Sequence, residues 1–137
     1  MRRQEKYPDT KTFHYFNANP HNKLGDDCAV RAICTALNQS WEQTVREMTE
    51  VGIKYGYVLN DKACIEKYLA SKGWKKASQP RKADGTKYTG KEYCSRLVDK
   101  SPRIVNIGGH HMVAIVNYKV YDIWDSTDGC IGNVWTK

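Results

Sequence analysis

Two groups of residues in this sequence have the types and spacing that covalent catalysis needs, and they lie far apart along the chain. Cys28 follows Asp27 at the start of an apolar segment, where the unpaired N–H groups and the dipole of a helix would favour a thiolate. Far downstream, His111 opens an apolar strand pattern and Asp125 follows the returning strand. A thiol, an imidazole and a carboxylate together can carry out nucleophilic acyl transfer.

The segment that begins at Cys28 is expected to form a buried helix. Residues 28–37 are small or apolar except at Arg31 and Thr35, and Asp27 is a suitable N-cap. The helix alone favours a packing role for its cysteine, because cysteine is among the most buried residue types. The histidines and carboxylates near the C-terminus favour catalysis instead. We expect Arg31 to pair with a nearby carboxylate, Asp26, Asp27 or one on a strand, as structural support.

The register of one predicted hairpin decides which residues are the base and the acid. A two-residue turn at Asn117–Tyr118 would place His110 opposite Asp125. The same register would put His111 and Asp122 diagonally on one face. A turn one residue longer would place His111 opposite Asp125 instead. Since a slip of one residue moves each side chain to the other face, only one register can hold, and the sequence leaves both open.

The order of the remaining patterns, helices first and strands afterwards, predicts a single α+β domain over residues 1–137. Residues 1–24 are expected to be partly irregular. Capping-box sequences at Ser40 and Thr89 would open two helices, and another is expected from about Asp61 to Lys72. Short strands are expected at 12–16 and from Trp74, and an antiparallel sheet of about four strands at 103–107, 110–116, 120–124 and 130–135.

Composition argues against several classes of protein. The five cysteines are scattered and odd in number, which argues against a disulfide framework or zinc site and favours a reducing, cytoplasmic setting. No apolar run suits a signal peptide or a membrane span, so no membrane partner is expected. The net charge of +7 is concentrated in the basic loop 75–91. That loop matches no nucleic-acid-binding motif and has no stacking aromatic beyond Tyr88, which favours a solvated loop over a nucleic-acid site.

These motifs resemble those of papain-like cysteine peptidases. The strand His111–Val116 followed by Asp125-Ser126 is similar to the papain-like histidine strand and its return, including that of the bacteriocin-processing relatives. Gly25–Ala32 together with Val120–Ser126 resembles small papain-like cysteine proteases common in bacteria and their phages. The chain order Cys, His, Asp agrees with the family. The middle helices fit in kind but carry no specific signature.

The resemblance implies a papain-like fold and a peptidase that cleaves an amide or isopeptide bond of a protein or peptide through an acyl-enzyme. In that fold a buried nucleophile helix packs against a twisted antiparallel sheet, and no metal or organic cofactor is needed. Carried over by residue, Cys28 is the nucleophile, His111 the general base and Asp125 the orienting acid. Asn22 stands where the family usually has a glutamine that helps to form the oxyanion hole.

Two other functions fit the same residues. A deamidase or transglutaminase-type enzyme acting on a host protein would use the same triad, and ammonia release would distinguish it. A non-catalytic basic module would instead bind an acidic protein or nucleic acid, and its binding would survive Cys28→Ala. Trp124 and Trp135 are expected to pack in the core rather than line a groove. The substrate and the oligomeric state are not encoded in any recognisable pattern, and specificity would lie in loops 52–60 and 75–90.

Overall fold

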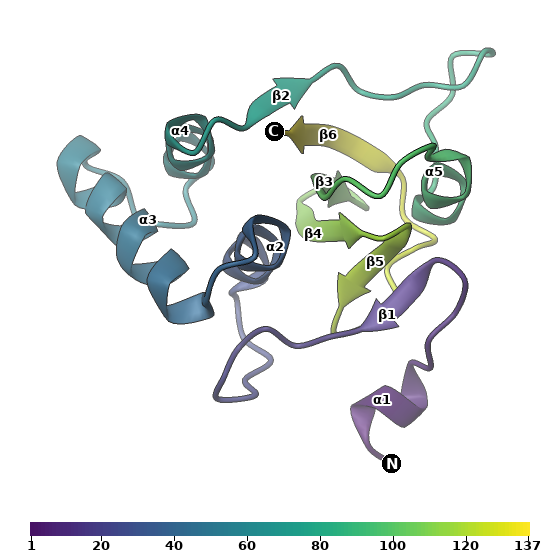
Figure 1. The fold of residues 1–137 in the computed structure, drawn as a ribbon, viewed down its shortest axis with the longest axis horizontal. Coiled ribbons are helices and arrows are strands. Elements are labelled where there is room, and N and C mark those ends of the chain that lie inside the picture. The colour runs from purple at the N-terminus through teal and green to yellow at the C-terminus, as the bar shows by residue number, and fades with distance from the viewer.

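The computed structural model describes residues 1–137 as an α+β fold in which N-terminal helices pack on a six-stranded mixed sheet (Figure 1). This confirms the predicted α+β class. The helices are α1 (Arg3–Lys6), α2 (Cys28–Leu37), α3 (Trp41–Tyr55), α4 (Lys62–Ser71) and α5 (Gly90–Arg96). The strands are β1 (Phe13–Tyr15), β2 (Lys75–Ala77), β3 (Arg103–Ile107), β4 (His111–Val116), β5 (Lys119–Asp122) and β6 (Ile131–Thr136).

The sheet has the strand order β1-β5-β4-β3-β6-β2. The four predicted C-terminal strands form its centre and are mutually antiparallel. The sheet is larger than the expected four antiparallel strands. Strand β2 pairs with β6 in the antiparallel direction, and β1 pairs with β5 in the parallel direction. Phe13 is fully buried and pairs with Val120, so the N-terminal segment covers an edge that would otherwise be open.

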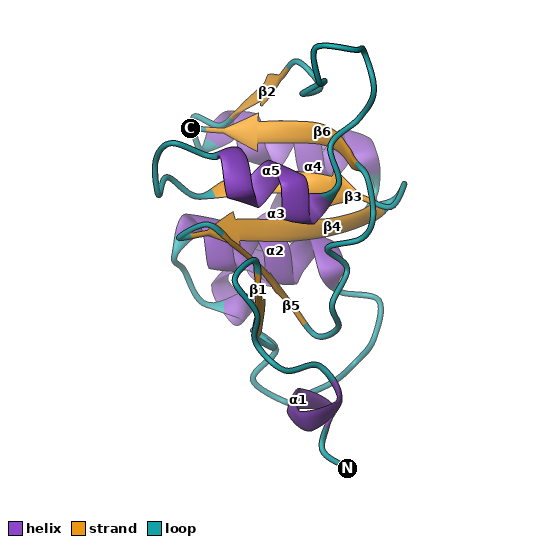
Figure 2. Ribbon diagram, turned by 90° about the vertical axis from the view of Figure 1, so that its right-hand side faces the viewer, coloured by secondary structure: helices purple, strands orange, loops and turns teal.

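The sheet separates two apolar cores, one on each face (Figure 2). Helices α2, α3 and α4 cover one face, and α5 covers the other (Figures 1 and 2). Helix α2 lies directly against β4, and its residues Val30 and Ile33 are almost completely buried. The buried helix predicted from the apolar segment is therefore confirmed, and it connects the thiol to the strand that carries His111.

Local sequence explains how the helices begin and end. The Ser40 hydroxyl accepts from the Gln43 backbone N–H at 3.0 Å, whereas the Gln43 side chain turns to Glu47 instead of completing the predicted box. At α5 the box is complete, because Thr89 and Glu92 each accept from the other's backbone. These hydrogen bonds cap the N-termini of α3 and α5 at the residues that the sequence predicted.

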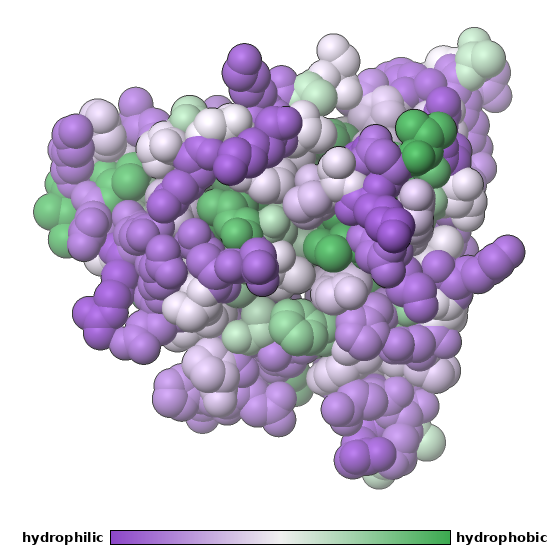
Figure 3. Space-filling view, in the orientation of Figure 1, coloured by the Kyte–Doolittle hydropathy of each residue, from purple (hydrophilic) through white to green (hydrophobic).

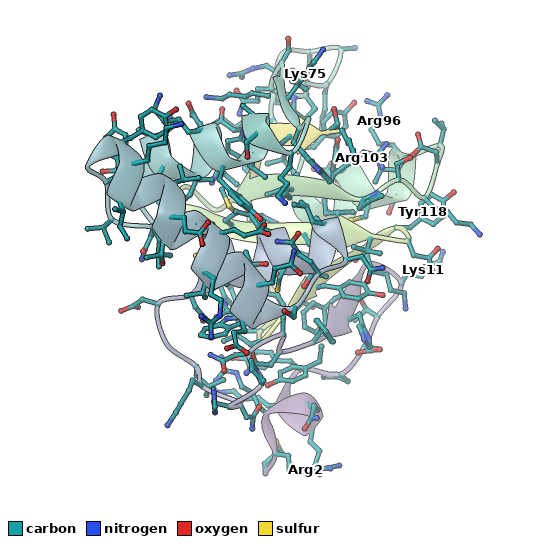
Figure 4. All side chains as sticks on the ribbon, turned by 60° about the vertical axis from the view of Figure 1, so that its left-hand side comes forward. Arg2, Lys11, Lys75, Arg96, Arg103 and Tyr118 are labelled. Atoms are coloured by element: carbon teal, nitrogen blue, oxygen red, sulfur yellow. The ribbon has the colours of Figure 1, made fainter.

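The surface is mostly hydrophilic on the face drawn in Figure 3. Lys75 and Arg96 lie at the margin of the molecule with their side chains in solvent (Figure 4).

Within the basic loop, Lys82 forms an ion pair with Glu92. At the end of the loop, the Lys91 Nζ lies 2.7 Å from Asp128 Oδ1. Acidic side chains therefore neutralise part of the loop's charge. None of the helices combines the length and the apolar character that crossing a bilayer would require.

Candidate active site

The thiol of Cys28 lies at the first residue of α2, as the sequence predicted. Asp27 occupies the N-cap position, but its side chain makes no capping hydrogen bond, so that part of the prediction was wrong. Its carboxylate instead accepts from Asn19 Nδ2 at 3.1 Å, from Trp41 Nε1 at 3.0 Å and from Arg31. Asp27 therefore anchors the loop that leads into the nucleophile.

A two-residue turn joins β4 to β5 and selects one of the two predicted registers. Asn117 and Tyr118 both have positive φ, at 51° and 69°, and Val116 pairs with Lys119. This is a type I′ geometry, whose twist suits a tight hairpin. Tyr118 marks the tip of the turn in Figure 4. The register is the one in which His111 and Asp122 were expected to share a face.

Asp122, and not Asp125, is the carboxylate beside His111. The distance from His111 Nε2 to Asp122 Oδ2 is 2.6 Å, and only 2% of the Asp122 side chain is exposed. Ser126 Oγ donates to the same oxygen at 2.9 Å. Asp125 instead accepts from the backbone N–H and hydroxyl of Thr127, so it stabilises a turn. The hairpin register is the physical reason for this correction.

Cys28 and His111 form a pair whose proton affinities are shifted in opposite directions. The hydrogen bond with His111 lowers the pKa of the Cys28 thiol against the opposing effect of burial, and the Met112 backbone N–H adds to the lowering. Burial lowers the pKa of His111, but hydrogen bonds to Asp122 and Cys28 outweigh it and raise that pKa from 6.5 to about 9. Both shifts favour a thiolate–imidazolium pair near neutral pH.

The Nε2 atom of His111 has a defined partner in the Asp122 carboxylate. Because Nε2 is engaged with Asp122, Nδ1 is the nitrogen left to face the Cys28 sulfur. The carboxylate fixes the ring orientation, and the fixed ring presents one nitrogen to the nucleophile. This is the geometry that a base needs if it is to exchange a proton with a thiol.

Arg31 connects the nucleophile loop to the acid. Its guanidinium is buried, with Nη1 on the Asp27 carboxylate and Nη2 at 3.8 Å from Asp122 Oδ1. The expected pairing is found with Asp27 and, at longer range, with Asp122, which is the strand carboxylate among the partners that the sequence left open. Charges therefore alternate from Asp27 through Arg31 and Asp122 to His111 and Cys28.

Trp124 covers the imidazole rather than packing in the core. The side chain is 38% exposed, and its ring centroid lies 5.2 Å from that of His111, at an interplanar angle of 34°. The prediction of a core role was therefore wrong for Trp124. Trp135 is buried in the core at 3% exposure, as expected, but it also borders a cleft.

A cleft of about 390 Å³ opens beside Cys28. Its lining comes from the nucleophile loop, the start of α4 and three strands, and consists of Asp26, Cys28, Ala29, Asn60, Lys62, Ile65, Asn106, Gly109, His110, Met112, Asn133 and Trp135. His110 is therefore a cleft residue and not the partner of the acid. Asn106 and Asn133 were missed from sequence, because isolated asparagines on two strands give no local signal.

The residue expected to complete an oxyanion hole lies outside this cleft lining. Asn22 is exposed in a left-handed conformation at φ 53°, and its Oδ1 accepts from Asn17 at 3.4 Å. As the first residue of α2, Cys28 has a backbone N–H without an intrahelical acceptor, and that N–H is available to an oxyanion.

The site has no cluster of metal-ligating side chains, since no three histidines, cysteines, aspartates or glutamates lie close enough to hold an ion. Its functional groups are therefore the thiol, imidazole, carboxylate and N–H donors already described. Comparison with known proteins found no matching family model, no matching curated protein and no matching solved structure.

Proposed function

We propose that this protein is a papain-like cysteine hydrolase that cleaves an amide or isopeptide bond in a protein or peptide. Cys28 is the nucleophile, His111 the acid and base, and Asp122 the residue that orients His111. The observation that carries the proposal is the connected series from the Cys28 thiol through His111 to Asp122 at 2.6 Å, with a lowered thiol pKa and a raised imidazole pKa.

Acylation begins when the Cys28 thiolate attacks the carbonyl carbon of the substrate. A carbon–sulfur bond forms, the carbonyl π electrons move to oxygen, and the Cys28 N–H donates to the resulting oxyanion. As the carbonyl re-forms, the carbon–nitrogen bond breaks and the imidazolium of His111 gives its Nδ1 proton to the leaving amine. The products of this half-reaction are a free amine and a thioester on Cys28.

Deacylation uses the same residues, with His111 now acting as the base and Cys28 as the leaving group. Neutral His111 removes a proton from water as the water oxygen bonds to the thioester carbon. The second tetrahedral intermediate collapses, expels the Cys28 thiolate and releases a carboxylic acid. The imidazolium is thereby restored beside the thiolate. Throughout, Asp122 keeps Nε2–H occupied, so Nδ1 remains directed at the reacting groups.

The arrangement of elements also supports the papain-like assignment. A helix with the nucleophile at its first residue packs on a central strand, and that strand begins with the histidine. The strand that follows it supplies the acid at its last residue. The order of Cys28, His111 and Asp122 along the chain is the order found in the motifs that the sequence resembles.

Burst kinetics with p-nitrophenyl acetate test the reaction without knowledge of the natural substrate. We expect one equivalent of p-nitrophenol per active site, followed by slower turnover, and an acetyl group on the Cys28 peptide by mass spectrometry. Cys28→Ala should abolish the burst, whereas the matched variant Cys34→Ala, on the same helix, should retain it. An acetyl group distributed over several cysteines, or no burst, would contradict the proposal.

A second measurement distinguishes cleavage of the substrate backbone from deamidation of substrate side chains. Casein incubated with the wild-type protein should yield new peptide fragments, each with a free carboxylate, and Cys28→Ala should yield none. If intact casein instead gains mass consistent with deamidation and ammonia is released, the enzyme is the deamidase of the same catalytic class.

A further inference from the structure

We propose that the cleft beside Cys28 is a specificity pocket for an uncharged amide side chain, with glutamine the best fit. The pocket would hold a side chain on the acyl side of the scissile bond. This inference rests on the proposed function, because it names the substrate that the same site would select.

The residues that line the cleft place it on the acyl side. Cys28 belongs to the lining, whereas neither His111 nor Trp124 does. The leaving amine must lie against His111, because that residue protonates it. A cleft that is lined by Cys28 but not by His111 therefore accepts the part of the substrate that stays attached to the thiol.

The floor of the cleft is apolar and rigid. Ala29, Ile65, Met112 and Trp135 line it and are all at most 7% exposed. They come from α2, α4, β4 and β6, so a packed core supports them from below. Such a floor favours the methylene groups of a substrate side chain. The volume of about 390 Å³ is within the range of ligand pockets.

Two carboxamides on adjacent strands supply the polar recognition. Asn106 on β3 and Asn133 on β6 are half-buried and line the cleft, and neither side-chain carboxamide makes a hydrogen bond to another protein group. A carboxamide both donates and accepts, so a pair of them complements a substrate amide, which does the same.

The charges at the cleft favour a neutral side chain. Asp26 and Lys62 line it, one of each sign, and both are exposed. Because these two charges are opposite, the pair adds no net charge to the cleft that would select an acidic or a basic side chain. A leucine would fit the floor but leave the two asparagines without partners when water is displaced, which costs binding free energy.

Fluorogenic peptides test the preference directly. Acetylated peptidyl-aminocoumarins carry Gln, Leu, Glu or Lys at either of the last two residues before the scissile bond, and kcat/KM is measured for each. At one of the two positions we expect Gln to exceed the other three by at least about tenfold.

Variants of the two asparagines test whether they cause the preference. Asn106→Leu and Asn133→Leu should invert the ratio of Gln to Leu. Asn133→Asp, which keeps the side-chain shape, should shift the preference toward Lys by adding a second carboxylate. Thr136→Val, on the same strand but outside the cleft, should leave the ratio unchanged.

Failure of the inference and failure of the proposed function give different results. If wild-type protein shows the Cys28-dependent acetate burst and cleaves the Leu peptides as well as the Gln peptides, the function stands and the pocket assignment falls. A Gln-to-Leu ratio that is unaltered in all three asparagine variants also overturns the pocket assignment. If the burst itself is absent, the proposed function falls, and the pocket assignment falls with it.

Discussion

Two cysteines on the same helix have opposite properties. Cys28 begins α2 and has a lowered pKa, with its hydrogen bond to His111 as the main cause. Cys34 lies in the interior of the same helix at 3% exposure, and burial raises its pKa to about 11. The Cys34 thiol donates to the Arg31 carbonyl at 3.4 Å and so behaves as a packed, neutral side chain.

The difference arises from what β4 presents to each end of the helix. At the Cys28 end, the strand supplies an imidazole and the Met112 N–H, both of which stabilise a thiolate. At Cys34 burial is the largest influence on the pKa and outweighs the hydrogen bonds with Thr35 that would lower it, so the neutral thiol is favoured. Cys94, on the other face of the sheet, behaves like Cys34, since burial raises its pKa to about 12. Among these three cysteines the thiolate is therefore favoured only where a strand end provides a base.

Removing each thiol gives the largest contrast between the two sites. Cys28→Ala should lower hydrolysis by about a thousandfold or more, because no other group forms the acyl-enzyme. Its free energy of unfolding should change little, since the thiol borders the cleft. Cys34→Ala should keep activity but lose about 1 kcal/mol of stability through a small cavity. Thermal melts and burst kinetics measure both, and a large fall in the melting temperature of Cys28→Ala would place that thiol in the core.

The two aspartates near His111 give the next largest contrast. Asp122→Asn should reduce kcat/KM by about a hundredfold or more, because the amide does not hold the imidazolium as a carboxylate does. Asp125→Asn should stay close to wild type, since Asp125 caps a turn. Steady-state kinetics of the two variants decide the matter. The opposite order would mean that the longer hairpin turn is the correct one.

The pH profile of hydrolysis tests whether Asp122 controls the pKa of His111. Activity requires the imidazolium beside the thiolate, so it should fall as pH rises past the His111 pKa of about 9. The carboxylate of Asp122 raises that pKa, and Asp122→Asn should therefore move the alkaline limb to lower pH by about one unit. An unchanged limb in the variant would show that Asp122 does not control His111.

Substitution of Arg31 should affect activity less than substitution of Cys28 or Asp122, but it should clearly lower the free energy of unfolding. Arg31→Met leaves the buried carboxylates of Asp27 and Asp122 without their cation, and unfolding should become easier by about 3–5 kcal/mol. Arg31→Lys should recover part of this loss. The control Arg46→Met removes an exposed pair with Glu42 and should cost less than about 1 kcal/mol. Equal losses in the two methionine variants, measured by chemical denaturation, would contradict the bridging role.

Local patterns explain why so much of the fold was predictable. Helix α2, the caps at Ser40 and Thr89 and the four central strands each have a signal within a few neighbouring residues. A short strand was expected where β1 lies, but its parallel pairing with β5 had no such signal, because the partner strand lies far along the chain. Edge strands of this kind depend on tertiary contacts.

The site was only half predictable, for a related reason. Cys28 and His111 begin a helix and a strand, so their places follow from local patterns. The choice between Asp122 and Asp125 depends on two residues of one turn, and of these only Asn117 is a residue that commonly adopts positive φ. The cleft asparagines come from strands distant in sequence, and no spacing rule reveals them. For Arg31 the sequence indicated a strand carboxylate as one possible partner but could not say which.

The most direct test of the central claim is the pH dependence of iodoacetamide labelling at Cys28, read by peptide mass spectrometry in wild-type protein and in His111→Ala. The exposed Cys130 serves as the internal reference. We predict that Cys28 is alkylated far faster than Cys130 at about pH 6, and that His111→Ala removes this advantage. If Cys28 reacts only above about pH 8, or only after unfolding, there is no thiolate–imidazolium pair and the proposed hydrolase is wrong.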